Sequence, residues 1–88
     1  MAERSVQITN RNGLHARPAA EIVKAASRFQ SEITLVREEL EVNGKSIMGV
    51  MMLAAECGST VTVRATGPDE EMALESITDL IHRGFGEV

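Results

Sequence analysis

Aromatic residues are almost absent from this chain, which has two phenylalanines and neither tyrosine nor tryptophan among its 88 residues. Because 43% of the residues are nonetheless apolar, the hydrophobic core is expected to be built from aliphatic side chains. Proteins that bind single-stranded nucleic acid stack bases on aromatic rings, and nucleic-acid binding in general needs a basic surface. A formal net charge of −4, together with the missing rings, therefore argues against a nucleic-acid partner.

Cysteine and long apolar runs are also scarce. Cys57 is the only cysteine, so no disulfide can form within the chain, which fits the reducing cytoplasm. The first ten residues lack the apolar stretch of a secretory signal, and no apolar run approaches the roughly 20 residues of a membrane span. Potential metal ligands are too few for a metal site. We therefore expect one cytoplasmic, monomeric domain over residues 1–88, with no metal, no cofactor and no membrane insertion.

Four segments alternate between apolar and polar residues, which is typical of half-buried strands. They are residues 5–9, 32–37, 40–42 and 60–66. The dipeptides Glu38-Glu39 and Asn43-Gly44 are expected to form the turns that follow the second and third of these strands. Because each strand is apolar on one face only, the strands are expected to form an antiparallel sheet with one face open to solvent.

Three helices are expected between and after the strands. Residues 19, 22, 23 and 26 are apolar at the spacing of an amphipathic helix. Ser46 is a favoured N-cap for a short helix over residues 47–55, and the last helix begins at Pro68 or Asp69 and ends before Gly84. The order βαββαβα indicates an α+β fold, an open-faced β-sandwich whose four-stranded antiparallel sheet carries three helices on one face.

The segment NGLHARPA places a histidine, His15, where the first helix is about to begin. Gly13 allows a turn with positive φ before it, and Pro18 is tolerated in a first helical turn because that turn needs no N–H donor there. A residue before proline prefers extended geometry, however, so a helix that begins only at Pro18 is the alternative. A lone histidine is more often a loop or capping residue than a reactive one, so its neighbours decide the interpretation.

Helix N-termini have unpaired backbone N–H groups and a positive partial charge, and they therefore bind anions. The donors nearest the imidazole of His15 are the N–H groups of Ala16 and Arg17, and the guanidinium of Arg17 can bind phosphate as a planar fork. The sequence near His15 supplies neither a second metal ligand nor an obvious orienting carboxylate. This combination indicates a histidine that carries a phosphoryl group.

Two segments then resemble a known family. NGLHARPAAEIV and GKSIMGVMML are similar to the active-site and regulatory-serine signatures of the HPr family, the histidine phosphocarriers of the phosphoenolpyruvate:sugar phosphotransferase system. Their separation and the βαββαβα order match over essentially the whole chain. The resemblance implies that His15 accepts a phosphoryl group on Nδ1, the pros nitrogen, from phospho-enzyme I and donates it to the IIA domain of a sugar permease. Arg17 would stabilise the phosphate, and the protein would be a carrier rather than an enzyme.

Ser46 has two interpretations. As a plain N-cap it would stabilise its short helix by about 1 kcal/mol. The resemblance implies that HPr kinase/phosphorylase also phosphorylates it, which would add about −1.5 to −2 charges. That charge would repel an acidic partner surface and recruit a different partner, a catabolite-control regulator.

The helix after Ser46 is apolar almost all round, so one side must face away from the sheet. We expect Val50 and Leu53 to point inward. Ile47, Met48 and Met51 are then expected to be exposed and, by resemblance, to contact enzyme I and IIA domains together with part of the first helix. The expected docking residues are Ala20, Lys24, Ile47, Met48 and Met51.

Other functions stay open at this level. One is a nitrogen-branch phosphocarrier, and another is a regulatory module that binds a transcription regulator through phosphorylated Ser46. A third is a small ferredoxin-like binding domain without phosphate chemistry. The catabolite-repression homologue of the family lacks the active histidine, so the presence of His15 argues against assigning this chain to that homologue.

Overall fold

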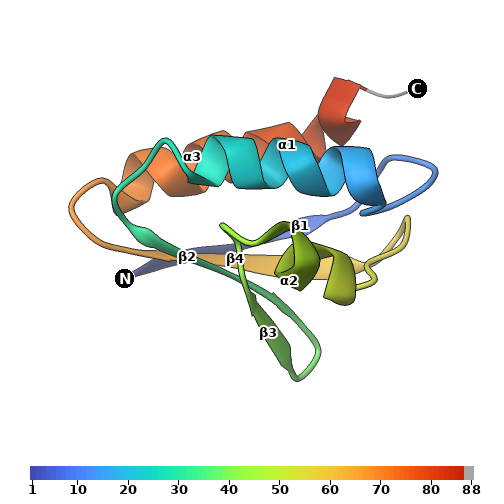
Figure 1. The fold of residues 1–88 in the computed structure, drawn as a ribbon, viewed down its shortest axis with the longest axis horizontal. Helices are drawn as coiled ribbons and strands as arrows, with labels where there is room; N and C mark the ends of the chain where they lie inside the picture. Colours follow the sequence, from blue (N-terminus) through green and yellow to red (C-terminus); the bar gives the residue numbers. More distant parts are fainter. Residues whose placement is uncertain (87–88) are drawn as a thin grey trace.

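The four strands and three helices follow one another in the expected order βαββαβα. The computed structural model describes residues 1–86, and a short 3₁₀ helix, η1, follows the last α-helix (Figure 1). The elements are β1 (Ala2–Gln7), α1 (Ala16–Ala26), β2 (Glu32–Arg37), β3 (Leu40–Asn43), α2 (Ile47–Met52), β4 (Thr60–Thr66), α3 (Glu70–His82) and η1 (Gly84–Gly86). Within the described residues no helix has the length and apolar character needed to cross a membrane.

The strands form one antiparallel sheet in the order β1-β4-β2-β3. The central strand β4 alternates strictly, with Val61, Val63 and Ala65 buried and the residues between them facing the other way. The helices α1 and α3 lie next to each other over the buried face, and α2 packs against α1 and β3 (Figure 1). On the open face, Arg64 pairs with Glu3 at 3.2 Å and with Glu41 at 3.3 Å. This arrangement confirms the expected α+β open-faced sandwich.

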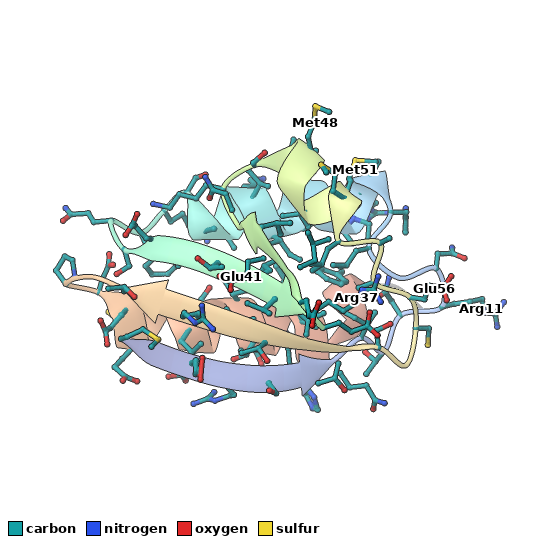
Figure 2. The ribbon with its side chains drawn as sticks, turned by 90° about the horizontal axis from the view of Figure 1, so that it is seen from below. Arg11, Arg37, Glu41, Met48, Met51 and Glu56 are labelled. Carbon is teal, nitrogen blue, oxygen red and sulfur yellow. The ribbon has the colours of Figure 1, made fainter. Side chains whose placement is uncertain are left out.

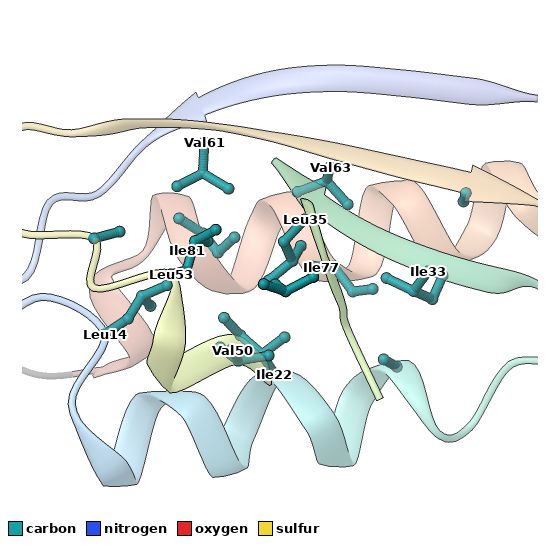
Figure 3. Close-up of a cluster of buried hydrophobic side chains, with 14 of the residues drawn as sticks. Leu14, Ile22, Ile33, Leu35, Val50, Leu53, Val61, Val63, Ile77 and Ile81 are labelled. Atoms are coloured by element: carbon teal, nitrogen blue, oxygen red, sulfur yellow. The ribbon is translucent and has the colours of Figure 1, made fainter. Parts of the chain in front are cut away.

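The core between the sheet and the helices is aliphatic, as the scarcity of aromatic residues predicted. Its largest fully buried members include Ile22, Leu35, Val50, Leu53 and Ile77, drawn with their neighbours in Figure 3. Each such side chain contributes roughly 1.5–3 kcal/mol relative to an exposed one. The two phenylalanines, by contrast, are only partly buried against this core.

The first strand begins and ends earlier than predicted, at Ala2–Gln7 instead of residues 5–9. Residues 2–4 show little apolar alternation, but an antiparallel partner supplies backbone hydrogen bonds whatever the side chains are. Ile8 lies just beyond the strand, yet it is buried, and its N–H donates to the carbonyl of Ser59 at 2.8 Å. Pairing with β4 therefore decides where this strand begins.

The helix α2 also ends earlier than predicted, at Met52 instead of residue 55. Ala54 adopts a positive φ of 50°, which a right-handed helix cannot continue through. The chain then turns so that the carbonyl of Ala55 faces the segment before α1. A tertiary contact, and not the apolar run itself, thus sets the length of α2.

Asp69 joins the start of α3 to the loop that follows α1. Its carboxylate accepts hydrogen bonds from the hydroxyl of Ser31 and from the backbone N–H groups of Gln30 and Ser31, at 2.9 and 3.0 Å. The hydrogen bond from the Ser31 hydroxyl, followed by that from the Gln30 N–H, lowers the pKa of Asp69 below its usual value. The connection helps to hold α1 and α3 side by side.

Candidate functional site

The loop before α1 is built around Gly13. Its N–H donates to the carbonyl of Asn10 at 3.1 Å, and the side-chain amide of Asn10 donates to the carbonyl of Gly13 at 2.7 Å. Gly13 has the positive φ that the sequence indicated, 65°, and a Cβ atom at this position would lie 2.4 Å from the carbonyl oxygen of Ala55. Both the dihedral angle and the close approach therefore require glycine.

Leu14 fixes the residue before His15 to the segment after α2. Its side chain is buried in the core (Figure 3). Its N–H donates to the carbonyl of Ala55 at 2.9 Å. The segment before α1 and the segment after α2 are therefore joined through their backbone, although Leu14 and Ala55 lie far apart in the sequence. This connection holds His15 in place while leaving its side chain at the surface.

His15 is the N-cap residue of α1, with extended backbone angles of φ −78° and ψ −173°. The N–H of Ala19 donates to the carbonyl of His15 at 3.0 Å, and Ala16 is already the first helical residue. The alternative of a helix that begins only at Pro18 is therefore wrong. The N–H groups of Ala16 and Arg17 consequently belong to the first turn of α1, whose donors have no hydrogen-bond acceptor within the helix.

The surroundings of this helix end suit an anion. None of the first three residues of α1 is acidic, and Arg17 is exposed beside the N-cap. The partial positive charge of a helix N-terminus stabilises a nearby anion by about 0.3–1 kcal/mol at an exposed site. A group carried by the imidazole of His15 would thus meet backbone donors and a guanidinium without having to enter a pocket.

Ser46 is the N-cap of α2, as the sequence indicated. Its Oγ accepts a hydrogen bond from the N–H of Gly49 at 3.1 Å, and its carbonyl accepts from the N–H of Val50 at 2.9 Å. The hydroxyl of Ser46 therefore caps α2. Because the residue is also partly exposed, a partner can reach it.

The outer side of α2 is apolar and exposed. Val50 and Leu53 are fully buried, as predicted. We call the exposed set the α2 face; it consists of Ile47, Met48, Met51 and Met52, whose exposed fractions are 46%, 74%, 43% and 66%. Figure 2 shows Met48 and Met51 pointing away from the body of the molecule. Ala20 and Lys24 of α1 are exposed as well.

Two features of this region were missed by sequence reasoning. Met52 was not placed among the docking residues, although its exposure exceeds that of Met51. Arg37, at the end of β2, donates from Nε to the carbonyl of Leu53 at 2.8 Å and so caps the end of α2. No local pattern in the sequence indicates that contact, because the two residues meet only in the folded chain.

The described residues offer few other places for chemistry. Among residues 1–86, no three His, Cys, Asp or Glu side chains lie close enough together to bind a metal ion. A groove of about 720 Å³ lies between β1 and α3 and is lined by Arg4, Val6, Met72 and neighbouring residues. His15 and Arg17 do not line this groove, and both are exposed at the surface.

Known proteins match this chain along nearly its whole length. The family model for the HPr component of the phosphotransferase system, described as its phosphorylation site, matches residues 2–83. Phosphocarrier protein HPr of Treponema pallidum is 54% identical over 87 residues, which cover 99% of each chain. The crystal structure of HPr from Thermoanaerobacter tengcongensis superposes with a TM-score of 0.96 at 46% identity, covering 100% of this chain and 99% of that one. The HPr-like protein Crh of Halalkalibacterium halodurans is 45% identical over 83 residues, which cover 94% of this chain and 99% of that protein.

Sequence and fold thus agree over the same residues. The matched range contains both expected signatures, around His15 and around Ser46, and the structural match extends over all elements of the fold. The identity to the relatives is far above the level at which only the fold would be shared. This chain therefore belongs to the HPr family, the phosphocarrier proteins of the phosphotransferase system, which carry a phosphoryl group and are not enzymes themselves.

Proposed function

We propose that His15 accepts a phosphoryl group from phosphorylated enzyme I and passes it to a IIA domain of a sugar permease. The observation that carries this proposal is the position of His15 as N-cap of α1, directly before Ala16 and Arg17, whose N–H groups belong to the first helical turn. In the first step, the lone pair of Nδ1 of His15 attacks phosphorus, and the bond between phosphorus and enzyme I breaks. In the second step, an acceptor side chain of the IIA domain attacks phosphorus, and the bond between phosphorus and Nδ1 of His15 breaks.

A carrier must bind the phosphoryl group without trapping it. The helix end contributes only about 0.3–1 kcal/mol, and an exposed arginine adds a charge-assisted hydrogen bond that solvent weakens. Both Arg17 and His15 are exposed, so a partner can surround the group and supply the remaining transition-state contacts. The exposed position of His15 is consistent with chemistry that two partners complete in turn.

The α2 face is the surface at which we propose that enzyme I and the IIA domains dock, together with Ala20 and Lys24 of α1. It combines flexible apolar side chains with one nearby cation, a composition that adapts to more than one partner. Because the bond between Leu14 and Ala55 joins the start of α1 to the end of α2, a partner on this face is positioned next to His15.

We further propose that HPr kinase/phosphorylase phosphorylates Ser46, which would place about −1.5 to −2 charges at the edge of the α2 face. The added charge would weaken docking of enzyme I and favour a catabolite-control regulator. Ser46→Asp should therefore lower the rate of transfer from enzyme I while leaving the thermal midpoint of unfolding nearly unchanged. An unchanged transfer rate would contradict electrostatic regulation.

Labelling with enzyme I and phosphoenolpyruvate tests the central proposal. The expected product is an adduct on His15 that is labile in acid and stable in base, as phosphohistidine is, and that His15→Ala abolishes. A folded protein that gains no phosphate, or a gain that persists in His15→Ala, would overturn it. Arg17→Lys serves as a matched control, since it keeps His15 and the positive charge at residue 17 but replaces the planar guanidinium with an ammonium group.

A second candidate function is a mainly regulatory one, favoured by the similarity to the HPr-like protein Crh. In that case phosphorylated Ser46 would bind a regulator while His15 stays unused, and the labelling experiment would detect no phosphohistidine. A nitrogen-branch carrier would instead donate its phosphoryl group to a nitrogen-type IIA domain. We favour the sugar branch and a monomer that works in the cytoplasm, in line with the single cysteine.

A further inference from the structure

Every methionine of this chain is exposed, but three of the five are gathered on one short helix. Met48, Met51 and Met52 occupy half of the six positions of α2, at a spacing that places them on one side of the helix. The other two, Met1 before β1 and Met72 in α3, are 70% and 69% exposed. Exposure alone therefore does not distinguish the α2 methionines, whereas their clustering does.

The α2 face contains no charged or hydroxyl side chain. Apart from Ile47, its exposed side chains are thioethers, and a thioether is the one apolar side chain that oxidation turns polar and a reductase restores. Leucine or isoleucine would provide the same apolar contact without this property. Methionine at three neighbouring positions thus makes the surface adaptable and also allows its polarity to be changed and restored by chemical modification.

We propose that Met48, Met51 and Met52 form a site of reversible oxidation, at which a peroxide converts the α2 face from apolar to polar and so interrupts docking of the phosphoryl donor. This inference rests on the proposed role of the α2 face in docking. In the reaction, a sulfur lone pair attacks one peroxide oxygen, the O–O bond breaks and an S–O bond forms. The sulfur is oxidised by two electrons to the sulfoxide, and hydrogen peroxide is reduced to water.

The structure indicates that the modification changes docking and leaves the fold intact. Val50 and Leu53 supply the fully buried contacts between the α2 segment and the core, whereas Met48 and Met52 keep most of their surface exposed and Met51 keeps 43%. At the two ends of the helix, Oγ of Ser46 accepts a hydrogen bond from the N–H of Gly49, and Nε of Arg37 donates one to the carbonyl of Leu53, so neither contact involves sulfur. In a docked complex, however, each sulfoxide oxygen would lose its hydrogen bonds to water without gaining a hydrogen-bond donor from the partner. This cost disfavours binding.

The test uses the full chain carrying Cys57→Ser, because the exposed thiol of Cys57 also reacts with peroxide. Three proteins are compared before and after hydrogen peroxide treatment, with the sulfoxide content of each methionine read by mass spectrometry. They are the Cys57→Ser protein itself, the same protein with Met48→Leu, Met51→Leu and Met52→Leu, and the same protein with Met72→Leu. The readout is the rate of phosphoryl transfer from enzyme I as a function of the concentration of this chain.

Oxidation should raise KM at least about tenfold in the Cys57→Ser protein and in its Met72→Leu variant, with a smaller change in kcat. The variant with three leucines should show the same KM before and after treatment, and methionine sulfoxide reductase should restore the oxidised proteins. Unchanged transfer by a protein with sulfoxide at all three α2 positions would overturn the proposal. An equal loss in the variant with three leucines would overturn it too, because the damage would then lie elsewhere.

A fourth protein separates failure of this inference from failure of the proposed function. It carries Met48→Gln, Met51→Gln and Met52→Gln, which make the α2 face polar without any oxidation. If it receives phosphate with an unchanged KM, the α2 face does not dock enzyme I, and the proposed docking surface falls along with the inference. If its KM rises while the peroxide-treated protein is unaffected, docking stands and only the oxidation proposal fails. Phosphohistidine formation on His15 remains testable in every arm.

Discussion

A single methyl group added at Gly13 would test how tightly the loop before His15 is held. In Gly13→Ala the new Cβ would lie 2.4 Å from the carbonyl oxygen of Ala55 and 2.9 Å from Cα of Glu56. Both contacts are with backbone atoms, so neither can be relieved by rotating a side chain. The loop after α2 must move, and the hydrogen bond from Leu14 to Ala55 lengthens or breaks.

The expected cost follows from separate contributions. A non-glycine residue at a φ of 65° costs roughly 1–2 kcal/mol, and loss of the Leu14 hydrogen bond costs about 0.5–1.5 kcal/mol more. The displaced backbone adds strain, so the free energy of unfolding should fall by about 2–4 kcal/mol. Because His15 follows directly, phosphoryl transfer from enzyme I should slow as well, even at temperatures where the variant is fully folded.

Gly58→Ala provides a matched control. Gly58 also has a positive φ, 94°, but a Cβ atom there would meet no atom within 4 Å. This variant should therefore lose only the conformational contribution, roughly 1–2 kcal/mol, and should transfer phosphate at the parent rate. Urea denaturation gives the free energy of unfolding of each variant, and the two values are compared at equal m-values. A Gly13→Ala variant no less stable than Gly58→Ala would refute the idea that close approach to Ala55 holds the His15 loop.

Three further outcomes are expected. Arg17→Ala should slow phosphoryl transfer with a change in unfolding free energy within about 0.5 kcal/mol, because the side chain is exposed; a large loss of stability on urea unfolding would contradict the assigned position. Arg37→Ala should lower the free energy of unfolding by about 1–2 kcal/mol because it removes the cap of α2, and Arg37→Lys should restore part of that loss. If the parent protein and both variants are equally stable, Arg37 does not cap α2. The pKa of Asp69 is lowered in the folded state, so its contribution to stability is present above its ordinary pKa and is lost as the pH falls through the folded value. Asp69→Asn should accordingly flatten the acid side of a stability–pH profile measured by thermal unfolding, and an unchanged slope would argue against that linkage.

Local patterns were sufficient to predict the type and order of the elements. The strict alternation of β4 and the apolar stripe that includes Ala19, Ile22 and Ala26 appear in the structure as a half-buried strand and an amphipathic helix. Both signals depend only on neighbouring residues, and the fold preserves them. The ends of β1 and α2 were predicted wrongly because pairing with β4 and the turn at Ala54 decide them.

The candidate site divides in a similar way. The predicted positive φ of Gly13 and the capping role of Ser46 could be read locally, since one depends on a single residue and the other on its own helix. The contacts of Arg37 with Leu53 and of Leu14 with Ala55 could not, because each joins segments that meet only after folding. The exposure of Met52 likewise depends on which side of α2 the sheet covers.

The amino-acid sequence by itself determined that an aliphatic, antiparallel α+β fold would present a histidine at the start of its first helix, because periodicity, turn residues and caps act over a few neighbouring positions. Only the tertiary structure decided that helix α2 would lie beside that histidine, held by the Leu14 hydrogen bond and the Arg37 cap. Contacts between residues far apart in sequence depend on the complete packing of the sheet and helices, and no local pattern contains that information.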